Sequence, residues 1–541
     1  MKAFTEPLLS LAGFEEMTKT AEKSSGLISV TGCIDAQKSQ MIYAFGGHRK
    51  NKLIVTFGEQ KAKELYDEYS FFDKEVVYYP SKDVLFYQSD IRGNLLTAER
   101  IRALKAIHEQ ERVTLVTTFD ALMNTMAPIE KMWENVLTLE QGQLLDLKEI
   151  QAALIRMGYE KEYQVQTMGQ FSVRGGILDV FPLTEENPIR IELWGDEIDT
   201  IRYFDCESQK SIENIDRVSI YPAAELVLSD EEKAGGIEKL KAEAKRVSDK
   251  LRKQMKTEEA HRVTVMADEL TEEWGELSMY AGMDAFLSYF FDERVGLLDY
   301  FKPSDSLIFF DELTRCTEQG KLTETEFSES MKQRLAMGYI LPGQMNGLFT
   351  EKEIVAKLEK YSCIALGALD NKANGLHQLG SYGIHCQSVS PYNNSFELLI
   401  KDLKRYKKNG YRVILLSGSR TRAKRLSEDI TDQGITCFYT ENYDHELFEG
   451  QIMVCYGKVR RGFEYPILKF AVITESDIFG AQQKKKKRHR TYEGEKIQSF
   501  TDLSVGDYVV HENHGLGIYR GIEKLEVDKK VKDYIKIEYQ G

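Results

Sequence analysis

The sequence is poor in cysteine, and its cysteines lie far apart. There are seven in 541 residues, with no C-x-x-C pair among them. A zinc ribbon or a disulfide framework needs paired or closely spaced cysteines, so this pattern disfavours both and is typical of the reducing cytosol. We therefore predict a cytoplasmic protein without a metal site.

Long apolar runs and an excess of positive charge are also missing. The start, MKAFTEPLLSLAGFEEM, lacks the basic segment and the apolar stretch of a signal peptide, and no later run reaches membrane-spanning length. The formal net charge of −14 argues against a protein that coats nucleic acid over its whole surface. We expect no membrane contact and only local contact with DNA.

What the sequence does contain is an alternation of short β-rich runs with helical patterns. The apolar runs at 52–58, 75–80 and 113–119 are separated by helical segments such as 97–110. This order is typical of an α/β domain with a mostly parallel sheet. Because 541 residues are too many for one hydrophobic core, we expect about three to five domains.

Later segments follow other patterns. From about residue 160 the side chains alternate with period two between tight turns, which predicts a small antiparallel insertion. A β-α-β pattern returns at 411–440, in a region whose role the sequence does not indicate. The basic segment 481–498 is interpreted as a solvated linker, with contact to DNA or to an acidic partner as the minor alternative. The final block, 499–541, predicts a small barrel that stops on a strand and is therefore incomplete.

The stretch SVTGCIDAQKS nearly matches a phosphate-binding loop. If Gly32 is the first glycine of G-x-x-x-x-G-K-[ST], Lys38 and Ser39 stand at the lysine and hydroxyl positions, but Gln37 replaces the second glycine. A side chain there crowds a bound phosphate, and it would be strained if the position required a positive φ. Asp35 would add repulsion between like charges. We therefore predict a degenerate nucleotide site that does not function.

An acidic pair ends a later apolar strand, SLIFFDE. Asp311 and Glu312 stand where a Walker B strand carries the aspartate that positions Mg²⁺. An apolar strand ending in Asp-Glu is also common without any nucleotide, so the motif alone leaves both interpretations open.

Longer stretches resemble a known family. LLDYFKPSDSLIFFDE and QFSVRGGILDVFP are similar, in the same order, to segments of the excision-repair helicase UvrB. VITESDIFG, the basic segment and GDYVVHENHGLGIYRGI are similar to the transcription-repair coupling factors (Mfd), and the resemblance to the N-terminal portion of that family covers essentially the whole chain. It implies a UvrB-like module that has lost its nucleotide site, with ATP and Mg²⁺ serving a translocase motor beyond residue 541.

The resemblance also implies an organisation into domains. A degenerate helicase-like α/β domain takes up 1–128 and 217–385, and an inserted UvrA-binding domain takes up 129–216. A further α/β domain follows at 390–480, then the basic linker at 481–498 and a truncated Tudor-like (CarD-like) barrel at 499–541.

A candidate partner surface lies in the predicted insertion. In IRIELW the apolar residues alternate with Arg190, Glu192 and Trp194, which therefore face away from the core, and in FSVR the outward residues are Ser172 and Arg174. Trp and Arg are enriched at interface hot spots, although Trp194 could instead stack on Arg190 or lie under a neighbouring domain. The resemblance implies that Arg174, Arg190 and Trp194 contact UvrA, with phenylalanine common at the third position.

The last domain, by the same resemblance, docks on the β subunit of RNA polymerase. Its motif does not identify the contacting residues, and we name Glu512, Leu516 and Tyr519 as candidates. His511 and His514 have no Cys or carboxylate partners at ligand spacing, which disfavours a metal site there.

These observations predict an adaptor for DNA repair that binds stalled RNA polymerase and UvrA. We expect no catalytic residue in this portion, and we expect DNA to be bound mainly by the motor domains of the whole protein. A UvrB-type helicase is the enzyme alternative, opposed by Gln37 and by the lack of a long aromatic hairpin after VVYYP. A CarD-like transcription regulator is the third interpretation, and it leaves most of the chain unexplained.

Overall fold

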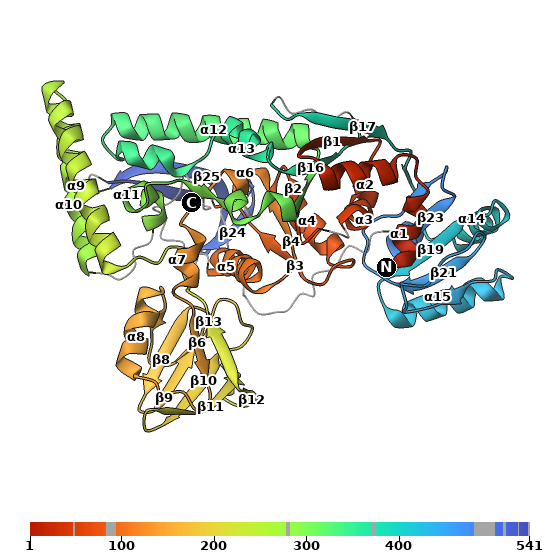
Figure 1. Cartoon of the computed structure of the whole chain (residues 1–541), viewed down its shortest axis with the longest axis horizontal. Coiled ribbons are helices and arrows are strands. Elements are labelled where there is room, and N and C mark those ends of the chain that lie inside the picture. Colours follow the sequence, from red (N-terminus) through yellow and green to blue (C-terminus); the bar gives the residue numbers. More distant parts are fainter. Residues whose placement is uncertain are drawn as a thin grey trace.

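The chain folds as a multidomain α/β protein. The computed structural model describes residues 1–46, 49–82, 94–276, 282–369, 375–480, 504–511, 515–527 and 530–538. In this part of the chain a parallel sheet, an antiparallel sheet, a mixed sheet and a small C-terminal sheet follow one another (Figure 1). The predicted combination of a parallel α/β unit with an antiparallel insertion is confirmed.

The largest sheet is parallel throughout. Its strand order is β17 (Gln378–Gly383), β1 (Gly26–Thr31), β16 (Ser362–Leu366), β15 (Ser306–Asp311), β2 (Asn51–Thr56), β4 (Val113–Thr118) and β3 (Val76–Tyr79). In β15, Ile308 and Phe310 enter one hydrophobic core, while Leu307 and Phe309 enter the other. A sheet covered on both faces needs apolar residues at successive positions, which explains the continuous apolar runs in the sequence.

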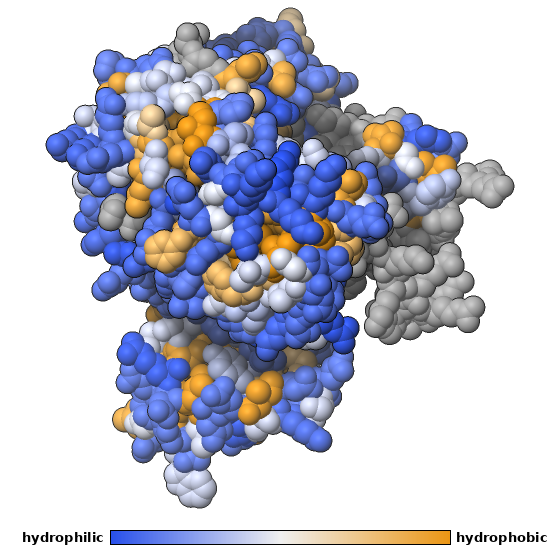
Figure 2. Space-filling model, turned by 90° about the vertical axis from the view of Figure 1, so that its right-hand side faces the viewer, coloured by the Kyte–Doolittle hydropathy of each residue, from blue (hydrophilic) through white to orange (hydrophobic). Residues whose placement is uncertain are grey.

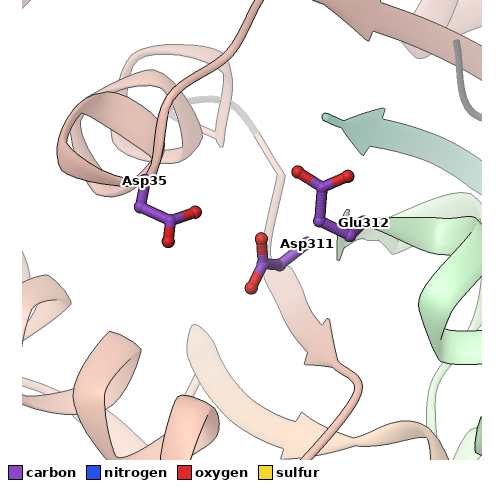
Figure 3. A group of neighbouring side chains, drawn as sticks. All are labelled: Asp35, Asp311 and Glu312. Carbon is purple, nitrogen blue, oxygen red and sulfur yellow. The ribbon is translucent and has the colours of Figure 1, made fainter. Parts of the chain in front are cut away.

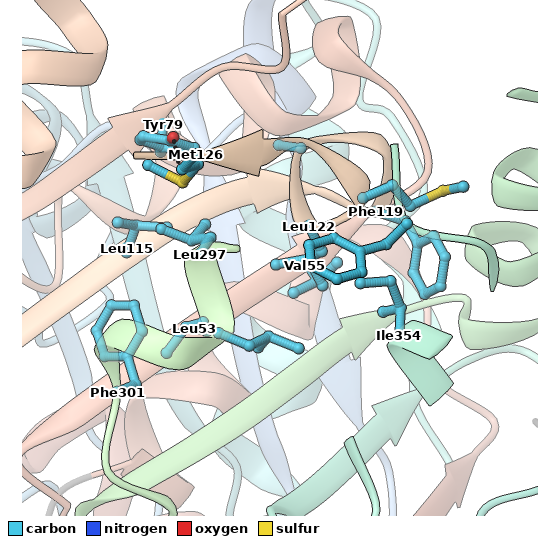
Figure 4. Close-up of a cluster of buried hydrophobic side chains, with 14 of the residues drawn as sticks. Leu53, Val55, Tyr79, Leu115, Phe119, Leu122, Met126, Leu297, Phe301 and Ile354 are labelled. Atoms are coloured by element: carbon cyan, nitrogen blue, oxygen red, sulfur yellow. Dashed lines mark hydrogen bonds between the residues drawn. The ribbon is translucent and has the colours of Figure 1, made fainter. Parts of the chain in front are cut away.

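Helices cover both faces of this sheet. One face packs against α1 (Lys2–Leu9), α2 (Phe14–Lys23), α3 (Asp35–Phe45) and α4 (Glu59–Tyr69). The other packs against α5 (Asn94–Glu109), α6 (Phe119–Met123), α12 (Leu313–Ala336) and α13 (Glu351–Leu358). Figure 4 shows part of this second core, in which Leu53 and Val55 of β2 lie among side chains from α6 and α13. Two shorter elements, β5 (Thr125–Met126) and β14 (Val295–Gly296), pair beside it.

The insertion is an antiparallel sheet with its own hydrophobic core. Its order is β12 (Ser211–Ile215), β11 (Glu197–Phe204), β10 (Ile189–Trp194), β9 (Ile177–Val180), β8 (Gln170–Arg174) and β7 (Glu160–Lys161), with only the β7–β8 pair parallel. Helix α8 (Leu147–Arg156) and the antiparallel pair of β6 (Leu137–Glu140) and β13 (Arg217–Ile220) close that core. The chain enters through α7 (Ile129–Trp133).

A buried ion pair ties the end of the insertion to the large sheet. The guanidinium of Arg100, on α5, donates to both carboxylate oxygens of Glu225 at 2.7 and 2.9 Å and to the carbonyl of Pro80 at 2.6 Å. Burial alone would raise the pKa of Glu225, but Arg100 and Lys82 outweigh it and lower that pKa to about 2.

The second large sheet is mixed and packs against the first. Its order is β18 (Gln387–Ser388), β22 (Phe463–Tyr465), β23 (Phe470–Thr474), β19 (Arg412–Ser417), β21 (Ile452–Tyr456) and β20 (Phe438–Tyr439), with α14 (Phe396–Lys408), α15 (Arg420–Asp432) and α16 (Glu475–Phe479). The apolar residues of one face join the same cluster as α1 to α4, while those of the other face form a separate core with α14, α15 and α16. Figure 2 views the molecule from this side, where hydrophilic residues predominate and apolar side chains form small patches.

The C-terminal residues form a small antiparallel sheet. Its strands are β24 (Tyr508–His511), β25 (Gly515–Val527) and β26 (Lys530–Glu538), in that order. The predicted linker at 481–498 lies outside the described residues.

A helical hairpin of α9 (Asp230–Lys253) and α10 (Thr257–Glu276) extends from the large sheet (Figure 1). Two adjacent glycines in α9 differ in surroundings. A Cβ on Gly236 would lie 2.2 Å from the ring of Phe290, in α11 (Leu287–Phe290), whereas a Cβ on Gly235 would meet no atom of the described chain within 4 Å.

We expect Gly236→Ala to lower the free energy of unfolding by about 1–3 kcal/mol, because the new methyl group overpacks the contact with Phe290. The matched control, Gly235→Ala, should raise it by about 0.5–1 kcal/mol through helix propensity alone. Urea denaturation of both variants measures the difference. Equal stabilisation by both would contradict the close contact at Phe290.

Candidate functional site

The degenerate phosphate loop is closed by backbone hydrogen bonds. The N–H groups of Gly32 and Cys33 donate to the carbonyls of Ala368 at 3.2 Å and Gly367 at 3.0 Å, and that of Gln37 donates to Ile34 at 3.3 Å. A working loop leaves such N–H groups free to surround the phosphates. These three donors are therefore already occupied by the protein itself.

Helix α3 begins too early for a phosphate loop. It starts at Asp35, so Gln37, Lys38 and Ser39 all lie inside it with their side chains buried. Gln37 therefore has an ordinary helical backbone, and the strain considered from the sequence for a positive φ does not arise. Gly32 does have φ +77°, and a Cβ there would lie 2.1 Å from the carbonyl oxygen of Ile384. This glycine is explained by its packing against the chain rather than by a phosphate.

The lysine of the loop is enclosed by three carboxylates. Lys38 Nζ lies 2.5 Å from Asp311 Oδ1, 2.9 Å from Glu312 Oε1 and 3.0 Å from Asp35 Oδ1, and its side chain is fully buried. Burial alone would lower the pKa of Lys38, but the attraction of these carboxylates outweighs it and raises the pKa. All three N–H bonds of the ammonium thus have acceptors within the protein.

The same three carboxylates could in principle share a metal ion. Their oxygens lie within 4.8 Å of one another, and Figure 3 shows Asp35 across from Asp311 and Glu312, which are consecutive residues. The ammonium of Lys38 already hydrogen-bonds to all three, and Asp311 Oδ2 also accepts a hydrogen bond from Thr56 at 2.9 Å. The predicted Walker B pair is therefore brought next to the predicted loop, where both acids hydrogen-bond to Lys38 of that loop.

The second large sheet covers the outer side of α3. The hydroxyl of Tyr465, in β22, lies 3.3 Å from Gln37 Oε1 and 3.2 Å from Gln40 Oε1, so its single proton is shared between them. Tyr465 is completely buried. Gln37, which stands where a phosphate-binding loop has its second glycine, thus contacts another domain. The sequence did not predict this contact, because Tyr465 is distant in the chain.

The insertion places the three predicted UvrA contacts on or beside one face. Ile189 and Ile191 are completely buried, Leu193 is half-buried after a register shift that follows Glu192, and Trp194 is 84% exposed. The predicted alternation in β10 is therefore confirmed. Trp194 is neither stacked on Arg190 nor covered by another domain in the described structure.

Arg190 is more constrained than the sequence suggested. Its Nε donates to Asp179 Oδ1 at 2.7 Å and its Nη2 to Asp179 Oδ2 at 2.9 Å, while the guanidinium lies 4.4 Å from the ring centre of Phe204. Arg174 Nη2 also donates to Asp179 Oδ2, at 2.7 Å. Sequence reasoning missed Asp179, although a single acid in the apolar run ILDVF, at an outward position between two arginine-bearing strands, was an available signal.

Ser172 lies on the outward face of β8, as expected, but it is not exposed there. Its side chain is buried, and its hydroxyl donates to the carbonyl of Tyr163 at 2.7 Å. The loop that carries Tyr163 covers this end of the outer face, so alternation along β8 did not predict exposure.

The candidate polymerase contacts are only partly within the described residues. Glu512 and His514 lie outside them. Leu516 pairs with Val510 in the small sheet, and the side chain of Tyr519 is buried. Among the described helices, none is long and apolar enough to cross a membrane.

Two segments match known domain families. Residues 137–226 match the UvrB interaction domain, and residues 503–541 match the CarD-like/TRCF RID domain. The first match coincides with the antiparallel insertion and the second with the C-terminal sheet.

Most of the chain is similar to curated transcription-repair-coupling factors. It is 30% identical to the one from Bacillus subtilis (strain 168) over 491 residues, which cover 90% of this chain and 41% of the relative. It is 30% identical to that of Staphylococcus haemolyticus (strain JCSC1435), over 95% of this chain and 44% of the relative. It is 28% identical to that of Staphylococcus aureus (strain MRSA252), over 98% of this chain and 44% of the relative. The chain spans less than half the length of these relatives. It corresponds to the N-terminal portion of a transcription-repair-coupling factor, with a UvrB interaction domain and a CarD-like RID domain.

Proposed function

We propose that this chain acts as an adaptor in transcription-coupled DNA repair: it binds UvrA through the insertion and the β subunit of stalled RNA polymerase through residues 499–541. The observation that carries the proposal is the exposed Trp194 at the end of β10, the strand that also carries the ordered Arg190, within the segment that matches the UvrB interaction domain. Tryptophan and arginine are the residue types that interface hot spots favour.

We further propose that this portion does not hydrolyse ATP. The closed loop and the enclosed lysine support this, because a phosphate would have to displace both the backbone carbonyls and the carboxylates. In the whole protein, ATP and Mg²⁺ would serve a DNA translocase motor, through which most of the contact with DNA would be made. No catalytic residue and no cofactor are assigned to the present chain.

The domain boundaries given from the sequence, including the linker at 481–498, remain our proposal for the organisation of this adaptor. A UvrB-type helicase is disfavoured by the same enclosed lysine. The segment after Lys82, where we expect no aromatic hairpin, lies outside the described residues. A CarD-like regulator accounts only for residues 503–541.

We expect Trp194→Ala to weaken the affinity for purified UvrA by about 2 kcal/mol, the scale of an interface hot spot, without lowering the melting temperature. Ile467→Ala is the control, because Ile467 is 76% exposed in the turn between β22 and β23 and lies outside the insertion. Calorimetric titration measures both affinities. Unchanged affinity in the tryptophan variant would contradict the assignment of this surface.

Replacing Lys38 should affect stability but not nucleotide binding. Lys38→Met leaves Asp311 buried without its counter-ion, and we expect the free energy of unfolding to fall by about 3–5 kcal/mol. Lys61→Met is the matched control, because Lys61 also pairs with Asp35, at 2.9 Å, but on a carboxylate that is 69% exposed; its cost should stay below about 1 kcal/mol. Titration with Mg-ATP should give no measurable heat for either variant or for the unaltered chain. Micromolar binding that Lys38→Met abolishes would support the helicase alternative.

Polymerase binding should reside in the last domain alone. Removing residues 499–541 is expected to abolish capture of the RNA polymerase β subunit while leaving capture of UvrA intact, because the described hydrophobic core of the insertion contains no residue from the last domain. A pull-down with each purified partner tests this. Simultaneous loss of both interactions would show that the two sites are not independent.

A further inference from the structure

The outer face of the insertion contains a buried acid. Leu178 and Val180 of β9 enter the hydrophobic core, so Asp179 between them faces the opposite side, where only 2% of its side chain is exposed. A carboxylate that is on the outer face of a sheet and yet buried must be covered by neighbouring side chains. Here those neighbours include Arg174 and Arg190, which also neutralise its charge.

The strand register explains the arrangement. β9 lies between β8 and β10, and Asp179 pairs directly with Ser172 on one side and Arg190 on the other. Arg174 stands opposite Ile177, one diagonal position away, from which its side chain reaches Asp179 Oδ2. One carboxylate therefore joins three strands and receives three charge-assisted hydrogen bonds.

Arg190 is held from two further directions. Its Nη2 also donates to Gln209 Oε1 at 2.8 Å, and its guanidinium lies over the ring of Phe204. A free arginine side chain samples many rotamers, and ordering it on binding opposes association. A side chain that is already ordered carries less of this cost, and the fork geometry of a guanidinium makes that ordering directional.

We infer that Asp179 is a positioning residue for UvrA binding: it fixes the guanidinium groups of Arg174 and Arg190 in the orientation in which they meet the partner. This inference rests on the proposed UvrA-binding function of the insertion. Arg174 keeps 36% of its side chain exposed and Arg190 keeps 13%, so both retain surface for a partner while Asp179 itself has almost none. Asp179 thus acts through the arginines and not by contact.

The test is a set of UvrA affinities measured on the full chain, with a thermal melt for every variant. Asp179→Asn keeps the shape of the side chain but replaces one acceptor oxygen by an NH₂ group that faces the guanidinium donors. We expect it to weaken UvrA binding about tenfold. Glu192→Gln is the matched control, because the carboxylate of Glu192 accepts hydrogen bonds from Arg202 and Thr200, whereas the two arginines donate to Asp179. It should leave the affinity unchanged.

A second comparison separates positioning from a general structural role. In a chain that carries Arg174→Ala and Arg190→Ala, the further change Asp179→Asn should have no effect on affinity, because the groups it positions are gone. An equal loss in both backgrounds would overturn the inference, as would full affinity of Asp179→Asn alone. If Asp179→Asn does not fold, Gln209→Ala, which removes one acceptor of Arg190 together with a donor to the carbonyl of Cys206, should weaken binding about threefold. Unchanged affinity of that variant would likewise overturn the inference.

Failure of this inference is distinguishable from failure of the proposed function. No binding of UvrA by the unaltered chain would refute the proposed function itself. Binding that depends on Trp194 but not on Asp179 would leave the function standing and refute only the positioning role.

Discussion

A buried ammonium needs counter-charges, and the carboxyl end of the large parallel sheet is organised around that requirement. Lys38 is fully buried, and an unpaired charge at such a site costs several kcal/mol. Asp311 comes from the end of β15, Glu312 from the left-handed residue that follows it at φ +59°, and Asp35 from the first turn of α3. Because all three converge on one nitrogen, the ends of these elements are held together as they would be around a phosphate and a metal ion, but by the protein alone.

The packing of the second large sheet is compatible with this closure. A nucleotide-binding loop must keep its outer surface accessible, whereas here α3 is packed on both sides. Gln37 and Gln40 accept the proton of Tyr465, and apolar residues of both sheets form a single cluster. Separating the two sheets would therefore expose both apolar surface and buried polar groups. Gln37 therefore stands at the position of the second loop glycine and also contacts the second large sheet through Tyr465.

On the outer face of the insertion, too, a buried charge is paired with opposite charges. Charged side chains that lie side by side on a sheet pair with one another when the register allows it. Arg190 faces away from the core, as expected, but it is held there by Asp179, Gln209 and Phe204. Trp194, at the end of its strand beyond a register shift, stays exposed. The face thus combines an ordered polar centre with one exposed aromatic side chain, a combination suited to selective docking.

The sequence by itself determined the secondary structure of these regions and their separation into a parallel sheet and an antiparallel insertion. It also determined the loss of the second loop glycine and the outward direction of Trp194, because apolar periodicity and residue type are local properties. Only the tertiary structure decided which side chains Lys38, Gln37 and Asp179 contact. Lys38 and Asp311 are 273 positions apart, and Gln37 and Tyr465 are 428 apart, so no local pattern connects them. Asp179 lies close in sequence to both of its arginines, but its contacts depend on the order and register of three strands, and strand register is set by the packing of the whole sheet.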